Sequence, residues 1–196
     1  MEKTENSNFI IQKTNSEEKG KNEVEAEIYK YEDIIERYSY FEKHFNPSKD
    51  RIYYPYCAGD ISPSEAFPKS EIIYVEKEEK YVKLLKEKKL NAYQANAETF
   101  NPQEVDILIM LSPEINPKKP SSSVINNGFI LCNNHTLTAN SLHKEPHLKF
   151  HGVLKKEGNQ IIFDKENLEK YFVKGKRIFT PRDIFVFQKI KNKAQF

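Results

Sequence analysis

A short turn of small and polar residues after the first predicted strand carries the clearest chemical signal in the sequence. It reads Tyr56-Cys57-Ala58-Gly59-Asp60-Ile61-Ser62-Pro63. Gly59 permits a tight turn and the close approach of a ligand to the backbone. Asp60 or Ser62 suits the cap of a following helix, and Pro63 suits its first position. Because a helix N-terminus has unpaired amides, the turn is either a ligand-binding turn or an ordinary strand-to-helix connection.

An acidic residue, Glu76, ends the second predicted strand, about 20 residues after the glycine turn, a spacing found in nucleotide-binding folds. A carboxylate can accept hydrogen bonds from two hydroxyls at once, which is the chemistry that recognises a ribose. The alternative is an exposed charge at the start of the lysine- and glutamate-rich helix that follows. The position of Glu76 directly after a run of strand residues favours ribose binding.

Polar stretches also follow the third, fourth and fifth predicted strands. They are Asn96-Ala97-Glu98, Ser112-Pro113-Glu114 and Asn133-Asn134-His135. Because the carboxyl ends of parallel strands share one edge of a sheet, these stretches should line the same crevice as the first turn. Each is otherwise an ordinary polar loop, and it is their convergence that favours a site. His135 is either a general base in that crevice or a loop residue that contacts the backbone.

The cysteines and the other histidines do not predict a metal site. Cys57 is a nucleophile only if a helix N-terminus lowers its pKa, whereas a cysteine that ends a buried strand is more often a small apolar residue. His143, His147 and His151 recur at steps of four without a nearby cysteine, which is not a metal-ligand spacing. The tyrosines around the first turn are placed to stack on a ligand ring.

Alternating apolar and helical patterns supply the elements that must position these residues. Apolar runs predict strands over 51–56, 71–75, 91–95, 105–111 and 128–132. Apolar residues at three- and four-residue steps predict helices over 23–44, 77–88 and 136–143. The last part of the chain is β-rich, with predicted strands over 149–154, 160–163 and 183–189 and a short helix over 167–172. This alternation predicts an α/β fold with a doubly wound, mostly parallel sheet.

The composition of the 196 residues narrows the function classes. The formal net charge of +2 gives no clustered basic footprint and hence no strong nucleic-acid signature. No apolar stretch is long enough to cross a membrane, the N-terminus is not a secretory signal, and only two cysteines are present, so we expect a cytoplasmic protein. The polar segment 1–22 is expected to be a mobile tail before a single domain over 23–196.

Taken together, these positions resemble the class I S-adenosylmethionine-dependent methyltransferase superfamily, with its Rossmann-like fold. The resemblance spans roughly residues 30–189, in the order of elements more than in motifs. It implies that residues 56–62 hold the methionine part of S-adenosylmethionine, that Glu76 binds the ribose and that Asn96 and Ala97 contact the adenine. It implies that the loop with Ser112 and Glu114 faces the methyl group and the substrate, and that a closing antiparallel strand spans 183–189; with His135 after the fifth strand, Ser112 and Glu114 are our candidates for the substrate side.

The sequence also departs from that superfamily at two places. The usual first turn carries two or three glycines, whereas only Gly59 is present here. The loop at Ser112 lacks the Asn/Asp-Pro-Pro-aromatic signature of enzymes that methylate amino groups of bases or glutamine. The sequence therefore predicts a methyltransferase whose substrate is a small molecule, a protein or an RNA. The alternatives are a catalytically inactive methyltransferase-like binding or regulatory protein and, third, a nucleotide-dependent oxidoreductase.

Overall fold

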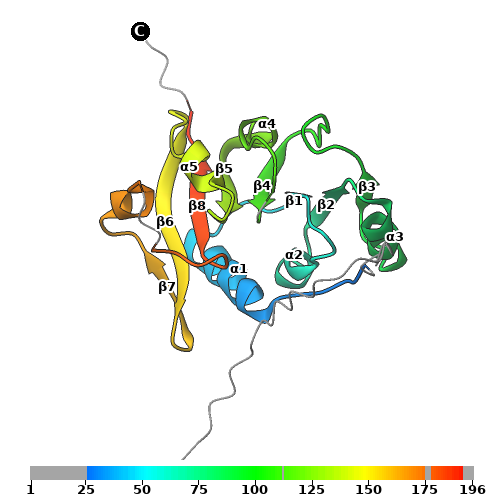
Figure 1. The fold of residues 1–196 in the computed structure, drawn as a ribbon, viewed down its shortest axis with the longest axis horizontal. Helices are drawn as coiled ribbons and strands as arrows, with labels where there is room; N and C mark the ends of the chain where they lie inside the picture. Colours follow the sequence, from blue (N-terminus) through cyan, green and yellow to red (C-terminus); the bar gives the residue numbers. More distant parts are fainter. Residues whose placement is uncertain (1–25, 112, 175–177, 192–196) are drawn as a thin grey trace, which may run out of the picture.

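A single eight-stranded sheet organises the chain, with helices on both of its faces (Figure 1). The structure is a computed structural model and describes residues 26–111, 113–174 and 178–191. The predicted tail over 1–22 lies outside these residues. Helices and strands alternate in the order α1 Glu32–Phe45, β1 Arg51–Pro55, α2 Ser62–Ala66, β2 Glu71–Glu76, α3 Glu79–Glu87, β3 Ala92–Gln94, β4 Val105–Met110, α4 Lys118–Ser121, β5 Val124–Cys132, α5 Thr138–Leu142, β6 Leu148–Glu157, β7 Gln160–Asp164, the 3₁₀ helix η1 Leu168–Phe172 and β8 Ile184–Lys189.

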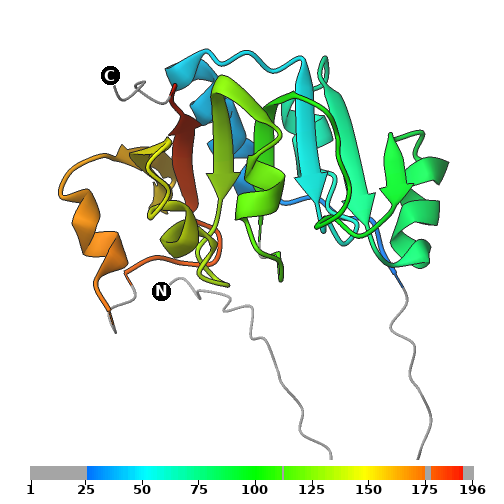
Figure 2. The ribbon, with the colours of Figure 1, turned by 90° about the horizontal axis from the view of Figure 1, so that it is seen from above.

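The strand order of the sheet is β3-β2-β1-β4-β5-β8-β6-β7. Strands β1 to β5 pair in parallel, and their arrows point the same way in Figure 2. Strand β8 pairs antiparallel with β5 and with β6, and β7 closes the edge as a hairpin with β6. This confirms the doubly wound, mostly parallel sheet and the antiparallel last strand.

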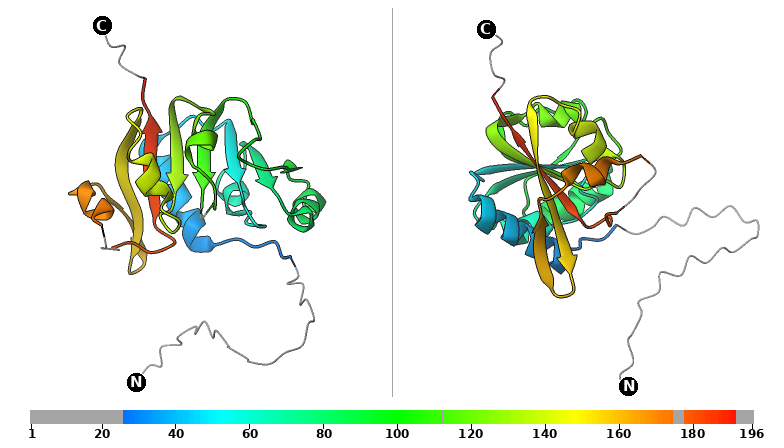
Figure 3. Two further views of the ribbon diagram at one scale, coloured as in Figure 1. Left: turned by 45° about the horizontal axis from the view of Figure 1, so that its top comes forward. Right: turned by 90° about the vertical axis from the view of Figure 1, so that its left-hand side faces the viewer.

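The core has two layers, one on each face of the sheet. On one face, Ile34, Tyr38 and Phe41 of α1 pack with apolar residues of α2, α3 and the sheet. On the other, Ala139 and Leu142 of α5 pack against the opposite sides of the strands. Strand β4 is buried along its whole length, as its near-continuous apolar run predicted. The hairpin of β6 and β7 projects beyond the sheet beside α1 (Figure 3), where Lys156 Nζ lies 2.7 Å from Glu36 Oε2.

The predicted helix over 23–44 is wrong at its beginning. The helix starts at Glu32, and the preceding residues form an extended segment, 26–31, that pairs with the first turn. The Tyr29 amide donates to Gly59 O at 3.1 Å, and the Ile61 amide donates to Tyr29 O at 2.9 Å. These bonds satisfy the backbone groups that a helix would otherwise pair, so a distant partner overrides the local apolar spacing.

No helix among the described residues is long and apolar enough to cross a membrane.

Candidate functional site

A cavity of about 330 Å³ opens at the carboxyl ends of β1 and β4, and we call it the first cavity. Its walls come from residues 29–34, from the first turn, from Leu111 and Asn133 after β4 and β5, and from Pro181 and Arg182 before β8. The chain runs outward from β1 to β3 and returns to β4 on the other side of β1. Open α/β sheets bind ligands at such a reversal of strand order, and the volume is within the range of small-molecule sites.

The first turn has an unusual backbone that Glu76 holds in place. Tyr56, Ala58 and Gly59 all have positive φ, at 53°, 45° and 85°. The Glu76 carboxylate is almost fully buried, and its Oε2 accepts the Ala58 amide at 3.0 Å. Its Oε1 accepts the amides of Lys77 at 2.7 Å and Glu78 at 3.3 Å. Because a carboxylate offers about four acceptor positions, Oε2 keeps one position for a further donor.

Asp60 places a buried carboxylate at the wall of the first cavity. Its Oδ2 accepts the Tyr54 hydroxyl at 2.9 Å, and its Oδ1 accepts the amide of Ser62 at 2.8 Å and the hydroxyl of the same residue. Burial raises the pKa of Asp60 above its ordinary value, although the hydrogen bonds from Ser62 and Tyr54 oppose that rise. The carboxylate thus also anchors the first turn of α2, where the cap is Ile61 and not Asp60 or Ser62 as predicted, so that Ser62 is the first helical residue and Pro63 the second.

Gly59 packs directly against the backbone of the segment 26–31. A Cβ at this position would lie 2.3 Å from the backbone oxygen of Glu27 and 3.3 Å from Cδ1 of Tyr81. The sequence predicted that the glycine lets a ligand approach, but the space beside its Cα is filled by the extended segment 26–31. The glycine therefore allows this segment to seat against the turn and to bring Tyr29 and Tyr31 to the cavity.

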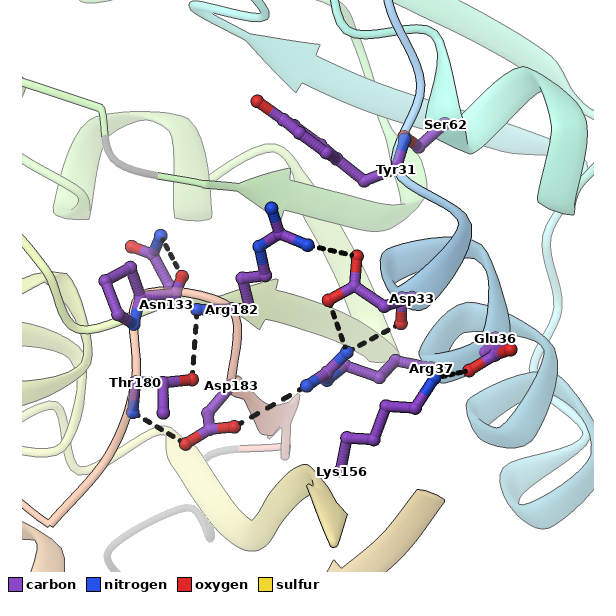
Figure 4. Close-up of polar contacts among 11 residues, drawn as sticks. Tyr31, Asp33, Glu36, Arg37, Ser62, Asn133, Lys156, Thr180, Arg182 and Asp183 are labelled. Carbon is purple, nitrogen blue, oxygen red and sulfur yellow. Dashed lines mark hydrogen bonds and ion pairs between the residues drawn. The ribbon is translucent and has the colours of Figure 1, made fainter. Parts of the chain in front are cut away.

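Arg182 and Tyr31 form the rim of the first cavity (Figure 4). One guanidinium nitrogen of Arg182 donates to Asp33 Oδ1 at 2.8 Å, and the guanidinium carbon lies 4.9 Å from the centre of the Tyr31 ring. The segment before β8 is held by Asn133, whose Nδ2 donates to Pro181 O at 3.0 Å. The rim therefore joins the start of α1 to the segment before β8.

A buried arginine, Arg37, lies behind this rim (Figure 4). Its side chain is only 3% exposed. Its Nη1 donates to the backbone oxygen of Asp33 at 2.6 Å and to Oδ2 of the same residue at 3.2 Å. Its Nη2 lies 3.8 Å from Oδ1 of buried Asp183, which also accepts the Thr180 amide at 2.7 Å. Asp33 thus binds both arginines, one buried and one at the surface.

Three predicted cofactor residues, Tyr56, Cys57 and Asp60, line the first cavity. Glu76 lies beneath the same turn, through its bond to Ala58. Asn96 is exposed near the end of β3, and its Oδ1 accepts the Glu98 amide at 2.9 Å and lies 3.4 Å from the Tyr56 hydroxyl. Tyr56 therefore stands between the cavity and Asn96.

The remaining predicted residues are more dispersed. Ala97 is packed in the core beneath the loop that follows β3. Ser112 lies outside the described residues, and Glu114 is exposed after β4. His135 is exposed beside a different cavity, on the far side of the segment before β8. A hydrogen bond of 3.1 Å from the Thr136 hydroxyl to Pro113 O holds the loops after β4 and β5 together.

Sequence reasoning missed Tyr29, Tyr31 and Arg182 as cavity residues. Tyr31 falls on the apolar face of the predicted helix over 23–44 and Tyr29 lies within the same range, which concealed their extended conformation. Arg182 directly precedes the last predicted strand and carried no motif. The only available signal was that aromatic and basic residues stand close to predicted strands. Such residues are too common at those positions to indicate a site.

Both cysteines are buried and free, and we expect neither to react in the native protein. Burial is the main cause that raises the pKa of Cys57 to about 12, and burial also raises that of Cys132. Since the thiolate is the nucleophile, native protein at mildly alkaline pH should stay unmodified by iodoacetamide, as read by intact mass. The same protein in guanidinium chloride should gain two adducts. Rapid native labelling of Cys57 would instead show an activated thiol at the cavity wall.

Known structures share this fold. No family model matches the sequence, and no curated protein matches it significantly. TrmN from Thermus thermophilus is 14% identical with a TM-score of 0.50 over 78% of this chain, which covers 48% of the TrmN chain. N-methyltransferase NodS from Bradyrhizobium japonicum WM9, in complex with S-adenosyl-L-homocysteine, is 8% identical with a TM-score of 0.53, over 79% of this chain and 83% of that one.

A third similar structure is the plantazolicin methyltransferase BpumL, in complex with a triazolic desmethylPZN analog and S-adenosyl-homocysteine. It is 9% identical with a TM-score of 0.54, over 81% of this chain and 85% of that one. At these identities the likeness is one of fold. The chain has the Rossmann-like fold of class I S-adenosylmethionine-dependent methyltransferases, which confirms the fold that the sequence predicted.

Proposed function

We propose that the protein is an S-adenosylmethionine-dependent methyltransferase. The observation that carries the proposal is the first cavity, which lies at the strand-order reversal of a methyltransferase-type sheet. Solved structures with this fold hold S-adenosyl-homocysteine. The two cysteines are free and buried, which suits the reducing, cytoplasmic compartment that we propose for the protein.

The residues around the first cavity fit the charged end of S-adenosylmethionine. Tyr29, Tyr31 and Tyr56 present aromatic rings, which attract a cation such as a sulfonium. Arg182 donates to Asp33 through one nitrogen and offers its remaining donors to a carboxylate. The acceptor position left on Glu76 Oε2 suits one ribose hydroxyl. Asn96, beyond Tyr56, is the proposed contact of the adenine.

Held by these residues, S-adenosylmethionine would supply an electrophilic methyl group to the lone pair of an acceptor, and the electron pair of its sulfur–carbon bond would remain on sulfur. The chain's residues hold the reacting groups in line and exclude water, which is the main contribution a protein makes to such a displacement. The proton released by the acceptor needs a base, and Glu114 and His135, on the joined loops after β4 and β5, are our candidates, with Ser112 on the same substrate side.

The test is calorimetric titration with S-adenosyl-homocysteine. Wild-type protein should bind it, and Glu76→Ala should lower the affinity about tenfold or more, because a charge-assisted hydrogen bond is lost. Glu76→Gln keeps an acceptor oxygen and should retain part of the affinity. The control is Glu71→Ala, at the exposed start of the same strand, which should leave affinity unchanged. Unchanged affinity in folded Glu76→Ala would remove its ribose role, and absence of binding to wild type would refute the proposed cofactor.

A further inference from the structure

A second, larger cavity of about 570 Å³ lies between α5 and η1, and we call it the second cavity. Phe172 and Phe179 contribute aromatic walls, and Lys144 and Lys174 lie among the lining residues. The stretch after β5 links the two cavities, because Asn133 lines the first and Asn134 the second. The segment 179–182 separates them and contributes residues to both.

The rim of the second cavity exposes apolar side chains. Leu137 is 62% exposed and Val173 is 52% exposed, and both line this cavity. Leu137 also has a positive φ of 62°, a strained conformation for a leucine, and its exposed side chain gains nothing from burial. The Phe172 wall is braced by His143, whose ring stacks on it with centroids 3.8 Å apart and planes 4° from parallel. A rigid aromatic wall beside exposed aliphatic groups suits a flat apolar ligand.

The second cavity has lysines but no carboxylates among its described lining residues. Lys144 and Lys174 are exposed, and neither forms an ion pair with any other residue that the structure describes. The carboxylates next along the chain face other partners: Glu145 lies 2.6 Å from Lys118, and Glu169 lies 3.6 Å from His143. The cavity therefore offers two cations that no carboxylate of the described residues pairs.

We propose that the second cavity binds a small organic anion with an aromatic or other flat apolar body. Apolar contact with Phe172 and Leu137 would hold the body, and the two lysines would hold its carboxylate, sulfonate or phosphate. Binding of the anion itself does not depend on methyl transfer.

The experiment compares two ligands of similar shape, 2-naphthoate and its neutral methyl ester. The chain has no tryptophan, so naphthalene emission can be followed without overlap from that residue. We expect naphthoate to bind about tenfold tighter than the neutral ligand, and the double variant Lys144→Gln, Lys174→Gln to abolish that preference. Both lysines are exposed, so these substitutions leave the core intact. The control Lys69→Gln removes another exposed lysine and should change nothing.

Each other outcome overturns the proposal. Equal affinity for the two ligands, or a preference that survives the double variant, would show that the lysines recognise no anion. A preference abolished by Arg182→Ala alone would assign the anion to the first cavity. Calorimetry with S-adenosyl-homocysteine on the same proteins separates the two proposals. Wild-type protein that binds S-adenosyl-homocysteine but shows no preference for naphthoate refutes only the second site, and wild-type protein with the preference but without S-adenosyl-homocysteine binding refutes only the proposed cofactor.

Discussion

Gly59→Ala is expected to destabilise the protein by about 3 kcal/mol or more, which is large for a single methyl group. The new Cβ would lie 2.3 Å from the backbone oxygen of Glu27, and the residue would keep a φ of 85°. That oxygen cannot retreat freely, because Tyr29 on the same segment bonds both Gly59 and Ile61. Equilibrium denaturation in urea measures the change. We also expect weaker binding of S-adenosyl-homocysteine, since a displaced segment removes Tyr29 and Tyr31 from the cavity.

A second glycine provides the matched control for this prediction. Gly158 lies between β6 and β7 with a φ of 58°, and a Cβ there would meet no atom within 4 Å. Gly158→Ala therefore carries only the penalty of a left-handed backbone, about 1 kcal/mol. If both variants lose the same free energy of unfolding, the contact between Gly59 and the segment 26–31 is not tight, and the seating of that segment does not depend on the glycine.

Arg37→Met should lower the free energy of unfolding by about 3 kcal/mol, because it leaves the buried carboxylate of Asp183 without its cation. Arg37 and Asp183 are 3% and 5% exposed, so water cannot replace the lost partner. Arg182→Met makes the same chemical change at an arginine that is 55% exposed and binds the same Asp33, and it should cost less than about 1 kcal/mol. Urea denaturation of both variants measures the contrast between a buried and a surface charge.

A double variant separates charge from packing at this position. Adding Asp183→Asn to Arg37→Met removes the uncompensated charge, and we expect the double variant to be more stable than Arg37→Met alone. If the second substitution lowers stability further, the loss in Arg37→Met comes from packing and from the bonds to Asp33. The pair then stabilises the segment before β8 without a large electrostatic contribution.

The strands and most helices of this protein could be predicted from local pattern alone. The near-continuous apolar run over 105–111 became β4, buried along its whole length, because a strand covered on both faces is mostly apolar. The spacing over 77–88 became α3, with Val82 and Leu85 buried. The polar stretches after the strands could be placed at one edge, because a parallel sheet aligns its carboxyl ends.

The start of the first helix and the lining of the cavities were decided by tertiary structure. Residues 26–31 have helical apolar spacing, but they pair with a turn about thirty residues away, and no local pattern specifies that partner. Arg182 and Tyr31 meet at the rim from opposite ends of the chain. The positive φ values of the first turn likewise determined which polar residues at the strand ends face the first cavity.

The sequence by itself thus determined the order of the elements, the doubly wound sheet and the edge at which its polar residues gather. Only the tertiary structure decided that Tyr29, Tyr31 and Arg182 line the first cavity and that His135 lies at the second. The physical reason is that the burial pattern of a strand or helix depends on residues that are close in the sequence. A cavity is formed by side chains that converge from distant segments, so it depends on how those segments pack.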